Sequence, residues 1–171
     1  DPWRLIDRDA AHDSGLVETL FAVGNGFIGV RAAPLDGSPG DSPGVIVNGF
    51  HETWPIEYPE NAYGLARIGQ SVVSAPDATA LTVTIDGAPL LGPTDEPGER
   101  TIDFRTGVLT RDSVHPTAGG GRVRVRSEVL VSVERRHVVA TRLSITALDH
   151  DVAVTVDSPV RNRQDERLTV A

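Results

Sequence analysis

The most regular pattern of hydrophobic and polar positions runs from Arg122 to Glu134. Valines occupy odd positions over this stretch, while arginine and glutamate occupy most of the even ones. Because successive side chains of a β-strand point to opposite faces of the sheet, a period of two predicts a long strand with one solvated face. We expect the arginines on that face to be solvated or to form an interface, and not to bind an anion.

Shorter stretches repeat the alternation. Residues 139–146 and 152–156 each place apolar side chains on alternate positions, and together with the long strand they are expected to form an antiparallel meander. Residues 80–87 predict another half-buried strand, and in the stretch 101–107 we expect Ile102 and Phe104 to point inward. The expected core contains Val123, Val125, Val131, Val133, Leu143, Ile145 and Val154.

No stretch of the chain has a sustained helical period. Many short strands separated by turn residues are typical of a β-sandwich or barrel. A length of 171 residues corresponds to one domain and suffices to bury a core. We therefore expect a single all-β domain over residues 1–171, built as an antiparallel sandwich or barrel.

The stretch Val47–Gln70 departs from the alternation and concentrates the rings of a chain that is only 5% aromatic. It contains Trp54, both tyrosines and Phe50. Proline disfavours a helical conformation in the residue before it, so Trp54-Pro55 and Tyr58-Pro59 predict extended backbone. We expect a long, ordered, non-helical loop.

Two interpretations of this stretch remain open. Aromatic rings beside carboxylates and amides suit a sugar, whose apolar faces stack on the rings while its hydroxyls bind polar groups. Alternatively, the stretch packs against a neighbouring domain, since long loops in compact domains are usually functional or interfacial. The substrate-proximal or domain-interface candidates are His51, Glu52, Trp54, Glu57, Tyr58, Glu60 and Tyr63.

The run Leu20–Arg31 contains two short apolar segments around Gly24-Asn25-Gly26. Asn-Gly between apolar segments predicts a tight β-hairpin. The glycines at positions 24, 26 and 29 also fit G-x-G-x-x-G, but a dinucleotide site requires a helix that begins at these glycines. The following residues are rich in proline and glycine, so we expect no nucleotide site.

Composition excludes several classes of partner. The formal net charge is −8, and all 16 basic residues are arginine, which argues against nucleic acid or an anionic membrane surface. Cysteine is absent, which fits a reducing cytoplasm. No apolar run is long enough for a membrane helix, and the first residues do not resemble a signal peptide. The absence of methionine, even at position 1, predicts a segment of a longer protein.

Catalytic motifs are also absent from the sequence. Hydrolysis of a glycoside requires two carboxyl groups about 5 to 9.5 Å apart, and Glu52, Glu57 and Glu60 are the only candidates we single out, in a stretch that also contains Arg67. We assign no catalytic residue. The five histidines are scattered singly, so no metal site is expected; they are His12, His51, His115, His137 and His150.

Four segments carry a resemblance to a known family. They are ETLFAVGNGFIGVR (18–31), VNGFHETWPIEYPENAYGLARIGQ (47–70), IDFRTGVLTR (102–111) and GRVRVRSEVLVSVERRHVVATRLSI (121–145). In this order they resemble the N-terminal domain of glycoside hydrolase family 65, which includes maltose, trehalose and kojibiose phosphorylases and acid trehalases. The resemblance departs at Phe27, where the family usually has tyrosine, and at Ala32, where it commonly has glycine.

The resemblance implies a β-supersandwich similar to galactose mutarotase, followed in the family by a helical linker and a catalytic (α/α)6 barrel. Its implied role is a non-catalytic scaffold and interface in an enzyme that cleaves an α-linked glucose disaccharide by inverting phosphorolysis or hydrolysis. The implied partner is the C-terminal catalytic domain, with a homodimer as a further expectation. No cofactor is implied beyond inorganic phosphate as co-substrate of a phosphorylase. Because family N-terminal domains are longer, strands that complete the sandwich are expected after Ala171.

Two rival interpretations stay open beside this one. The chain could be a free carbohydrate-binding module that stacks a sugar on Trp54, Tyr58 and Tyr63. It could also be a mutarotase-like epimerase, which would need a histidine and a glutamate facing one sugar, although a shared fold alone does not establish such an activity.

Overall fold

The structure is a computed structural model that describes residues 1–8, 14–32, 44–60, 62–90 and 98–160. These residues form one α-helix and twelve β-strands, and every strand pairing is antiparallel, which confirms the all-β prediction. The elements are β1 (Arg4–Asp7), α1 (Ser14–Leu20), β2 (Val23–Gly24), β3 (Ile28–Val30), β4 (Val45–Pro55), β5 (Ile68–Ser74), β6 (Thr82–Ile85), β7 (Ala88–Pro89), β8 (Glu99–Asp103), β9 (Val108–Pro116), β10 (Arg122–Val131), β11 (Val139–Ala147) and β12 (Val154–Asp157).

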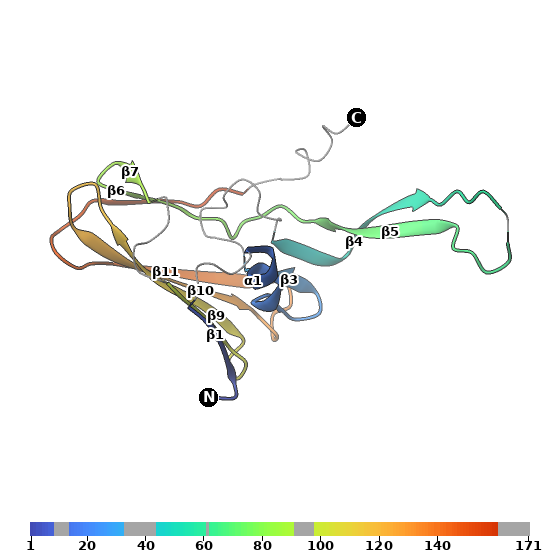
Figure 1. The fold of residues 1–171 in the computed structure, drawn as a ribbon, viewed down its shortest axis with the longest axis horizontal. Helices are drawn as coiled ribbons and strands as arrows, with labels where there is room; N and C mark the ends of the chain where they lie inside the picture. The colour runs from blue at the N-terminus through green and yellow to red at the C-terminus, as the bar shows by residue number, and fades with distance from the viewer. Residues whose placement is uncertain (9–13, 33–43, 61, 91–97, 161–171) are drawn as a thin grey trace.

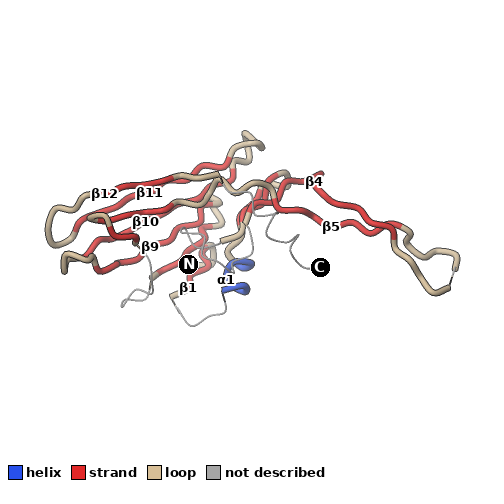
Figure 2. The backbone as a smooth tube through the Cα atoms, turned by 90° about the horizontal axis from the view of Figure 1, so that it is seen from above, coloured by secondary structure: helices blue, strands red, loops and turns tan. Residues whose placement is uncertain are grey.

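The strands form two layers. One layer is a five-stranded sheet in the order β1-β8-β9-β10-β11, called here the large sheet. Two smaller sheets, β12-β6-β7 and β2-β3-β4-β5, form the opposite layer, and β4 and β5 continue far beyond the layers as a long hairpin (Figures 1 and 2). Each smaller sheet packs on a different half of the large sheet.

Two apolar clusters join the layers. The first combines Leu109, Val129 and Val131 of the large sheet with Val30 and Val45 of the sheet β2-β3-β4-β5, and α1 packs against it through Val17. In the second, side chains of β10 meet side chains of β6 across the sandwich. Its buried members are Val83, Ile85, Val123 and Val125. Apolar burial of this kind is the main favourable term in folding.

Strand β10 follows the predicted alternation. Its odd residues are buried and its even residues face outward, apart from a half-buried Glu128. The strand ends at Val131, so Val133 lies in the following turn and is 85% exposed instead of being part of the core. Phe104 is likewise 57% exposed, because β8 ends at Asp103 and the ring belongs to the turn.

The predicted meander is half correct. Strand β11 pairs with β10, and Leu143 and Ile145 pack half-buried against the second cluster. Strand β12 instead crosses to the opposite layer and pairs with β6, Val154 opposite Ile85. Val154 is therefore an exposed residue of a different sheet and not a core residue. A period of two identifies a strand but not its neighbour.

Helix α1 was not predicted from the sequence. Val17 of the helix and Phe21, the residue after its last turn, enter the core, while Leu16 and Leu20 are exposed. Two inward positions four residues apart are too few to establish a helical period. Within the described residues, no helix has the length and apolar character needed to cross a membrane. Most of the proline- and glycine-rich residues that follow Arg31 fall outside the described residues.

Candidate functional site

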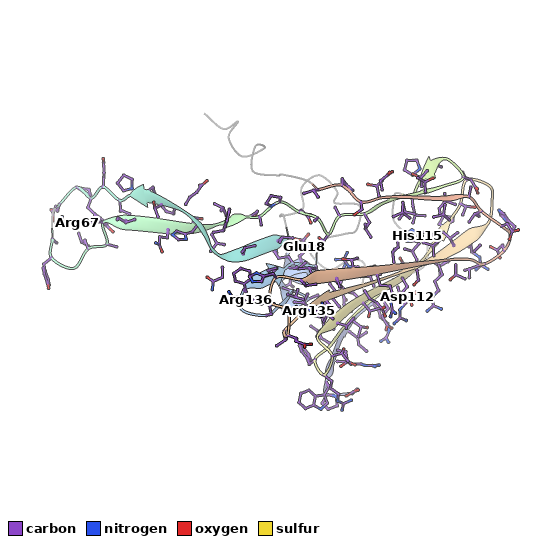
Figure 3. The ribbon with its side chains drawn as sticks, turned by 180° about the vertical axis from the view of Figure 1, so that it is seen from behind. Glu18, Arg67, Asp112, His115, Arg135 and Arg136 are labelled. Carbon is purple, nitrogen blue, oxygen red and sulfur yellow. The ribbon has the colours of Figure 1, made fainter. Side chains whose placement is uncertain are left out.

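The stretch Val47–Gln70 forms most of a long β-hairpin and is not the loop expected from its prolines. Cross-strand pairs run from His51 opposite Val72 to Pro55 opposite Ile68, and the Ile56 N–H donates to the Arg67 carbonyl at 2.9 Å just beyond them. We call residues 51–60 and 62–72 the hairpin arm. It projects well beyond the two layers (Figures 1 and 2), and Arg67 lies toward its outer end (Figure 3). The non-helical backbone at Trp54 agrees with the prediction, but the pairing does not.

Trp54 lies across the neighbouring strand of the arm. A Cβ atom built on Gly69, its cross-strand partner, would approach Trp54 Cε2 to 2.5 Å. A larger side chain at position 69 would displace the indole, so the glycine allows the indole to rest on the backbone. The indole remains 48% exposed and forms an apolar platform on the arm.

An open groove of about 690 Å³ lies at the base of the hairpin arm. A β-bulge between Ile46 and His51 bends β4 there, and Gly49 at its centre has a φ of 88°. Glycine adopts this left-handed conformation without steric cost, and a bulge turns the strand away from its sheet. The groove is lined largely by apolar residues, among them Phe27, Ile28, Ile46, Phe50 and Val72.

All seven candidate site residues belong to the arm. His51, Glu52 and Trp54 lie on β4, and the other four lie in the tip; these are Glu57, Tyr58, Glu60 and Tyr63. Every one of these side chains is exposed. A general acid keeps its proton through burial or a nearby like charge. Burial does not supply that condition on this arm.

The Gly-Asn-Gly turn has a structural role. Strands β2 and β3 pair across it as predicted, and β3 begins directly after it, where a dinucleotide loop requires a helix. The Asn25 side-chain amide donates to the carbonyls of Ser132 (2.6 Å) and Arg136 (3.1 Å), and its Oδ1 accepts from the Phe27 N–H (2.9 Å). The Phe27 ring lies 5.0 Å from the guanidinium of Arg136, which Figure 3 labels. Asn25 thereby fastens this turn to the β10–β11 connection.

Sequence reasoning missed a buried charged cluster beneath α1. Glu18 is only 3% exposed, and its Oε2 lies 3.5 Å from Nη2 of Arg31. The same Arg31 nitrogen donates to the Gly15 carbonyl (3.2 Å) and to Thr19 Oγ1 (3.0 Å). Burial lowers the pKa of the nearby Arg100, while the negative charges of Asp7 and Glu18 oppose that shift. Glu18 is the first and Arg31 the last residue of the family-like segment 18–31. The sequence analysis found no other signal that these two residues pair.

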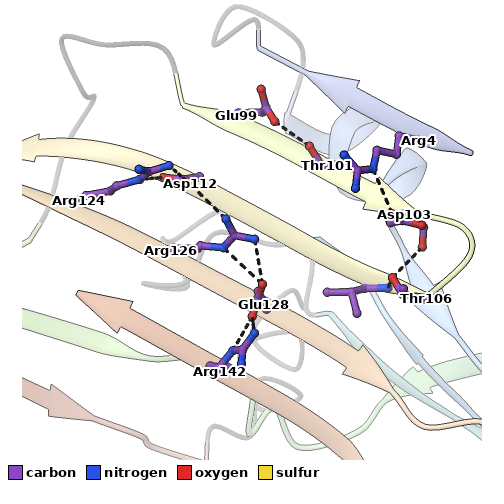
Figure 4. Close-up of polar contacts among 11 residues, drawn as sticks. Arg4, Glu99, Thr101, Asp103, Thr106, Asp112, Arg124, Arg126, Glu128 and Arg142 are labelled. Carbon is purple, nitrogen blue, oxygen red and sulfur yellow. Dashed lines mark hydrogen bonds and ion pairs between the residues drawn. The ribbon is translucent and has the colours of Figure 1, made fainter. Parts of the chain in front are cut away.

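The outer face of the large sheet carries an ion-pair network (Figure 4). Arg124 contacts Asp112 with N–O distances of 2.7 and 2.6 Å, and Arg126 contacts Glu128 at 3.0 Å. Arg142 also donates to Glu128. These arginines therefore pair with carboxylates of the same face, in keeping with a solvated or interfacial surface. Hydrogen bonds from Arg124 lower the pKa of Asp112, and those from Arg142 and Arg126 lower the pKa of Glu128.

Because of this network, we expect the folded chain to lose stability in acid. A carboxyl group whose pKa is lowered by folding contributes stability above its unfolded pKa, about 3.9 for Asp and 4.3 for Glu, and loses it as the pH falls through the folded pKa. We expect the urea midpoint to fall more steeply below about pH 4 than in a double variant, Asp112→Asn with Glu128→Gln. Urea melts at pH 7 and pH 3 measure this difference. Equal losses in the two proteins would show that the network contributes nothing.

The four described histidines lie in separate parts of the fold. Among the residues that the structure describes, no group of three or more His, Asp or Glu side chains could hold an ion. His115 accepts or donates a 2.8 Å hydrogen bond with Ser113 Oγ, and its burial lowers its pKa. His137 meets the Phe27 ring edge-on at 4.7 Å, and His150 covers Gly121. His12 lies outside the described residues.

Comparisons with known proteins agree with this architecture. Residues 8–170 match the glycosyl hydrolase family 65, N-terminal domain. An uncharacterised glycosyl hydrolase of Mycobacterium leprae is 34% identical over 97% of this chain and 21% of its own length. The α,α-trehalose phosphorylase of Thermoanaerobacter brockii is 28% identical over 86% of this chain and 20% of its own length.

A solved human-microbiome protein with the provisional name kojibiose phosphorylase shares the fold. Its TM-score is 0.78 at 19% identity, over 91% of this chain and 21% of that protein. The chain thus spans about a fifth of the length of the relatives it matches. The family match over residues 8–170 and the shared sandwich show that the chain belongs to glycosyl hydrolase family 65, as its N-terminal domain.

Proposed function

We propose that this domain is a non-catalytic scaffold and interface in an enzyme that acts on α-glucosidic disaccharides by inverting phosphorolysis or hydrolysis. The names of its relatives support the substrate class, since they include a trehalose phosphorylase and a kojibiose phosphorylase. The catalytic groups belong to the remainder of the parent polypeptide. Inorganic phosphate is its co-substrate if the reaction is phosphorolysis, the domain itself binds no cofactor, and the enzyme acts in the cytoplasm.

The exposed apolar surface of the hairpin arm carries this proposal. Trp54 presents its indole, Ile68 and Val72 are 64% and 59% exposed, and Tyr63 is fully exposed. Apolar side chains gathered on one projecting element mark an interaction surface, because isolated monomers rarely expose such patches. Aromatic anchors of this kind often contribute about 2 kcal/mol or more each to an interface.

An activity assay separates the roles of the two parts. We expect the parent enzyme, incubated with trehalose, kojibiose or maltose with and without phosphate, to release glucose or glucose 1-phosphate. The 171-residue chain alone should release neither, because its candidate carboxylates are exposed and no general acid is identified among its described residues. Turnover by purified chain that Glu52→Gln, Glu57→Gln or Glu60→Gln abolishes would contradict the non-catalytic assignment.

Replacement of Trp54 distinguishes a role of its ring in an interface from a role in internal packing. In the isolated chain, Trp54→Ala should lower the free energy of unfolding by no more than about 1 kcal/mol, because the indole is half-exposed and lies across the cross-strand residue Gly69. A urea melt measures this cost. A loss of about 3 to 5 kcal/mol would show that the ring belongs to the core. Saturable, Trp54-dependent binding of maltose, trehalose or glucose would instead support a carbohydrate-binding module.

A further inference from the structure

The two faces of the hairpin arm can be assigned from its strand register. Residues directly opposite each other in an antiparallel pair point to the same side. The pairs His51–Val72, Thr53–Gln70 and Pro55–Ile68 therefore share one face, called here the aliphatic face. The alternate pairs, Glu52–Ser71 and Trp54–Gly69, share the opposite face, called here the indole face.

Both faces expose apolar groups. Ile68 and Val72 are exposed on the aliphatic face, and Trp54 is half-exposed on the indole face. Within the described residues the arm has no second layer on either side, since the core clusters that join the layers contain none of its residues. A partner with a flat surface would cover only one face and leave the other in water. Removal of apolar surface from water on both faces requires a partner that surrounds the arm.

We propose that the hairpin arm inserts into a cleft of the remaining part of its own polypeptide, which covers both faces. This inference rests on the proposed function, in which the domain is one part of a larger enzyme. The relatives are long enough to form such a cleft outside this domain, since this chain spans only 21% of the Mycobacterium leprae protein. The two-sided exposure distinguishes an inserted arm from a domain that rests side by side with its neighbour.

The charge of the arm favours its own polypeptide over a second copy of the chain as the partner that covers it. The arm carries Glu52, Glu57 and Glu60 against the single cation Arg67. An arm-to-arm contact across a two-fold axis would bring two acidic arms together, and their like charges would repel. The cleft is therefore expected to be lined by apolar side chains with arginine or lysine at its rim.

Cysteine accessibility in the full-length parent enzyme tests the insertion. The described domain offers a clean background because its sequence contains no cysteine. Thr53→Cys reports on the aliphatic face, Ser71→Cys on the indole face, and Val133→Cys serves as an exposed control away from the arm. Maleimide labelling is quantified at each position by peptide mass spectrometry. We expect positions 53 and 71 both to label at least about tenfold more slowly than 133 in the native enzyme, and all three to label alike after denaturation.

Each outcome decides the question. Protection at both positions that is unchanged on dilution supports insertion into the same polypeptide. Protection at only one position overturns insertion and leaves a one-sided contact. Protection that disappears on dilution assigns the contact to a second copy. That result overturns the proposal that the arm's own polypeptide covers it. Fast labelling at both positions overturns insertion and shows that the arm is not part of the interface. The proposed disaccharide activity is tested separately, by the glucose and glucose 1-phosphate assay.

Discussion

Replacing Phe21 with alanine should lower the free energy of unfolding by about 3 to 5 kcal/mol. The ring is 2% exposed and packs in the first apolar cluster, where it joins the end of α1 to both layers. The guanidinium of Arg100 also lies 5.8 Å from its centroid. Removal of the ring leaves a cavity that close-packed neighbours can fill only in part. Urea unfolding of the variant and the parent chain measures the difference.

Phe104 provides the matched control. The same replacement removes the same atoms from a turn where the ring is 57% exposed. Phe104→Ala should therefore shift the urea midpoint by a small fraction of the Phe21→Ala shift. Similar losses at the two positions would contradict the placement of Phe21 in the core.

Removing the Glu18 carboxylate is expected to cost about 3 to 5 kcal/mol, because it leaves Arg31 without its buried carboxylate partner and removes one of the two negative charges beside Arg100, the other being Asp7. Glu18 faces both arginines from α1, and its contact with Arg31 joins the helix to the end of β3. Glu18→Ala tests this in a urea melt at pH 7. Glu52→Ala removes an exposed carboxylate of the arm and should change the melt little. A Glu18→Ala loss below about 1 kcal/mol would place this pair with ordinary surface ion pairs.

The alternation of β10 and the Asn-Gly turn were predictable because both depend on neighbours in the sequence. Side-chain direction in a strand has a fixed period of two, and a tight hairpin brings together segments that are already adjacent. The position of β12 was not predictable, since the choice between β11 and β6 depends on the path of the connecting segment. Val133 was misplaced for a related reason: the pattern of valines continues past the residue where the strand ends.

The non-helical backbone of residues 47–70 was predictable, but its pairing as a β-hairpin was not. The prolines predicted extended backbone at Trp54 and Tyr58 and wrongly suggested a loop throughout. Pro55 lies at the end of β4 opposite Ile68, where a missing N–H interrupts little of the ladder. The pairing of Trp54 with Gly69 joins residues fifteen positions apart around the tip, so no local pattern reveals it.

The strand edges of the hairpin arm have a consequence for the protein when its partner is absent. Strand β4 leaves β3 after Val47, and β5 is the outermost strand of its sheet, so beyond the bulge both strands lack a further neighbour among the described elements. The segment IGQSVVS of β5 contains neither charge nor proline, the two features that usually prevent edge-to-edge pairing. The glutamates of the arm repel other copies near neutral pH, so fibrillar association should increase as acid or salt weakens that repulsion.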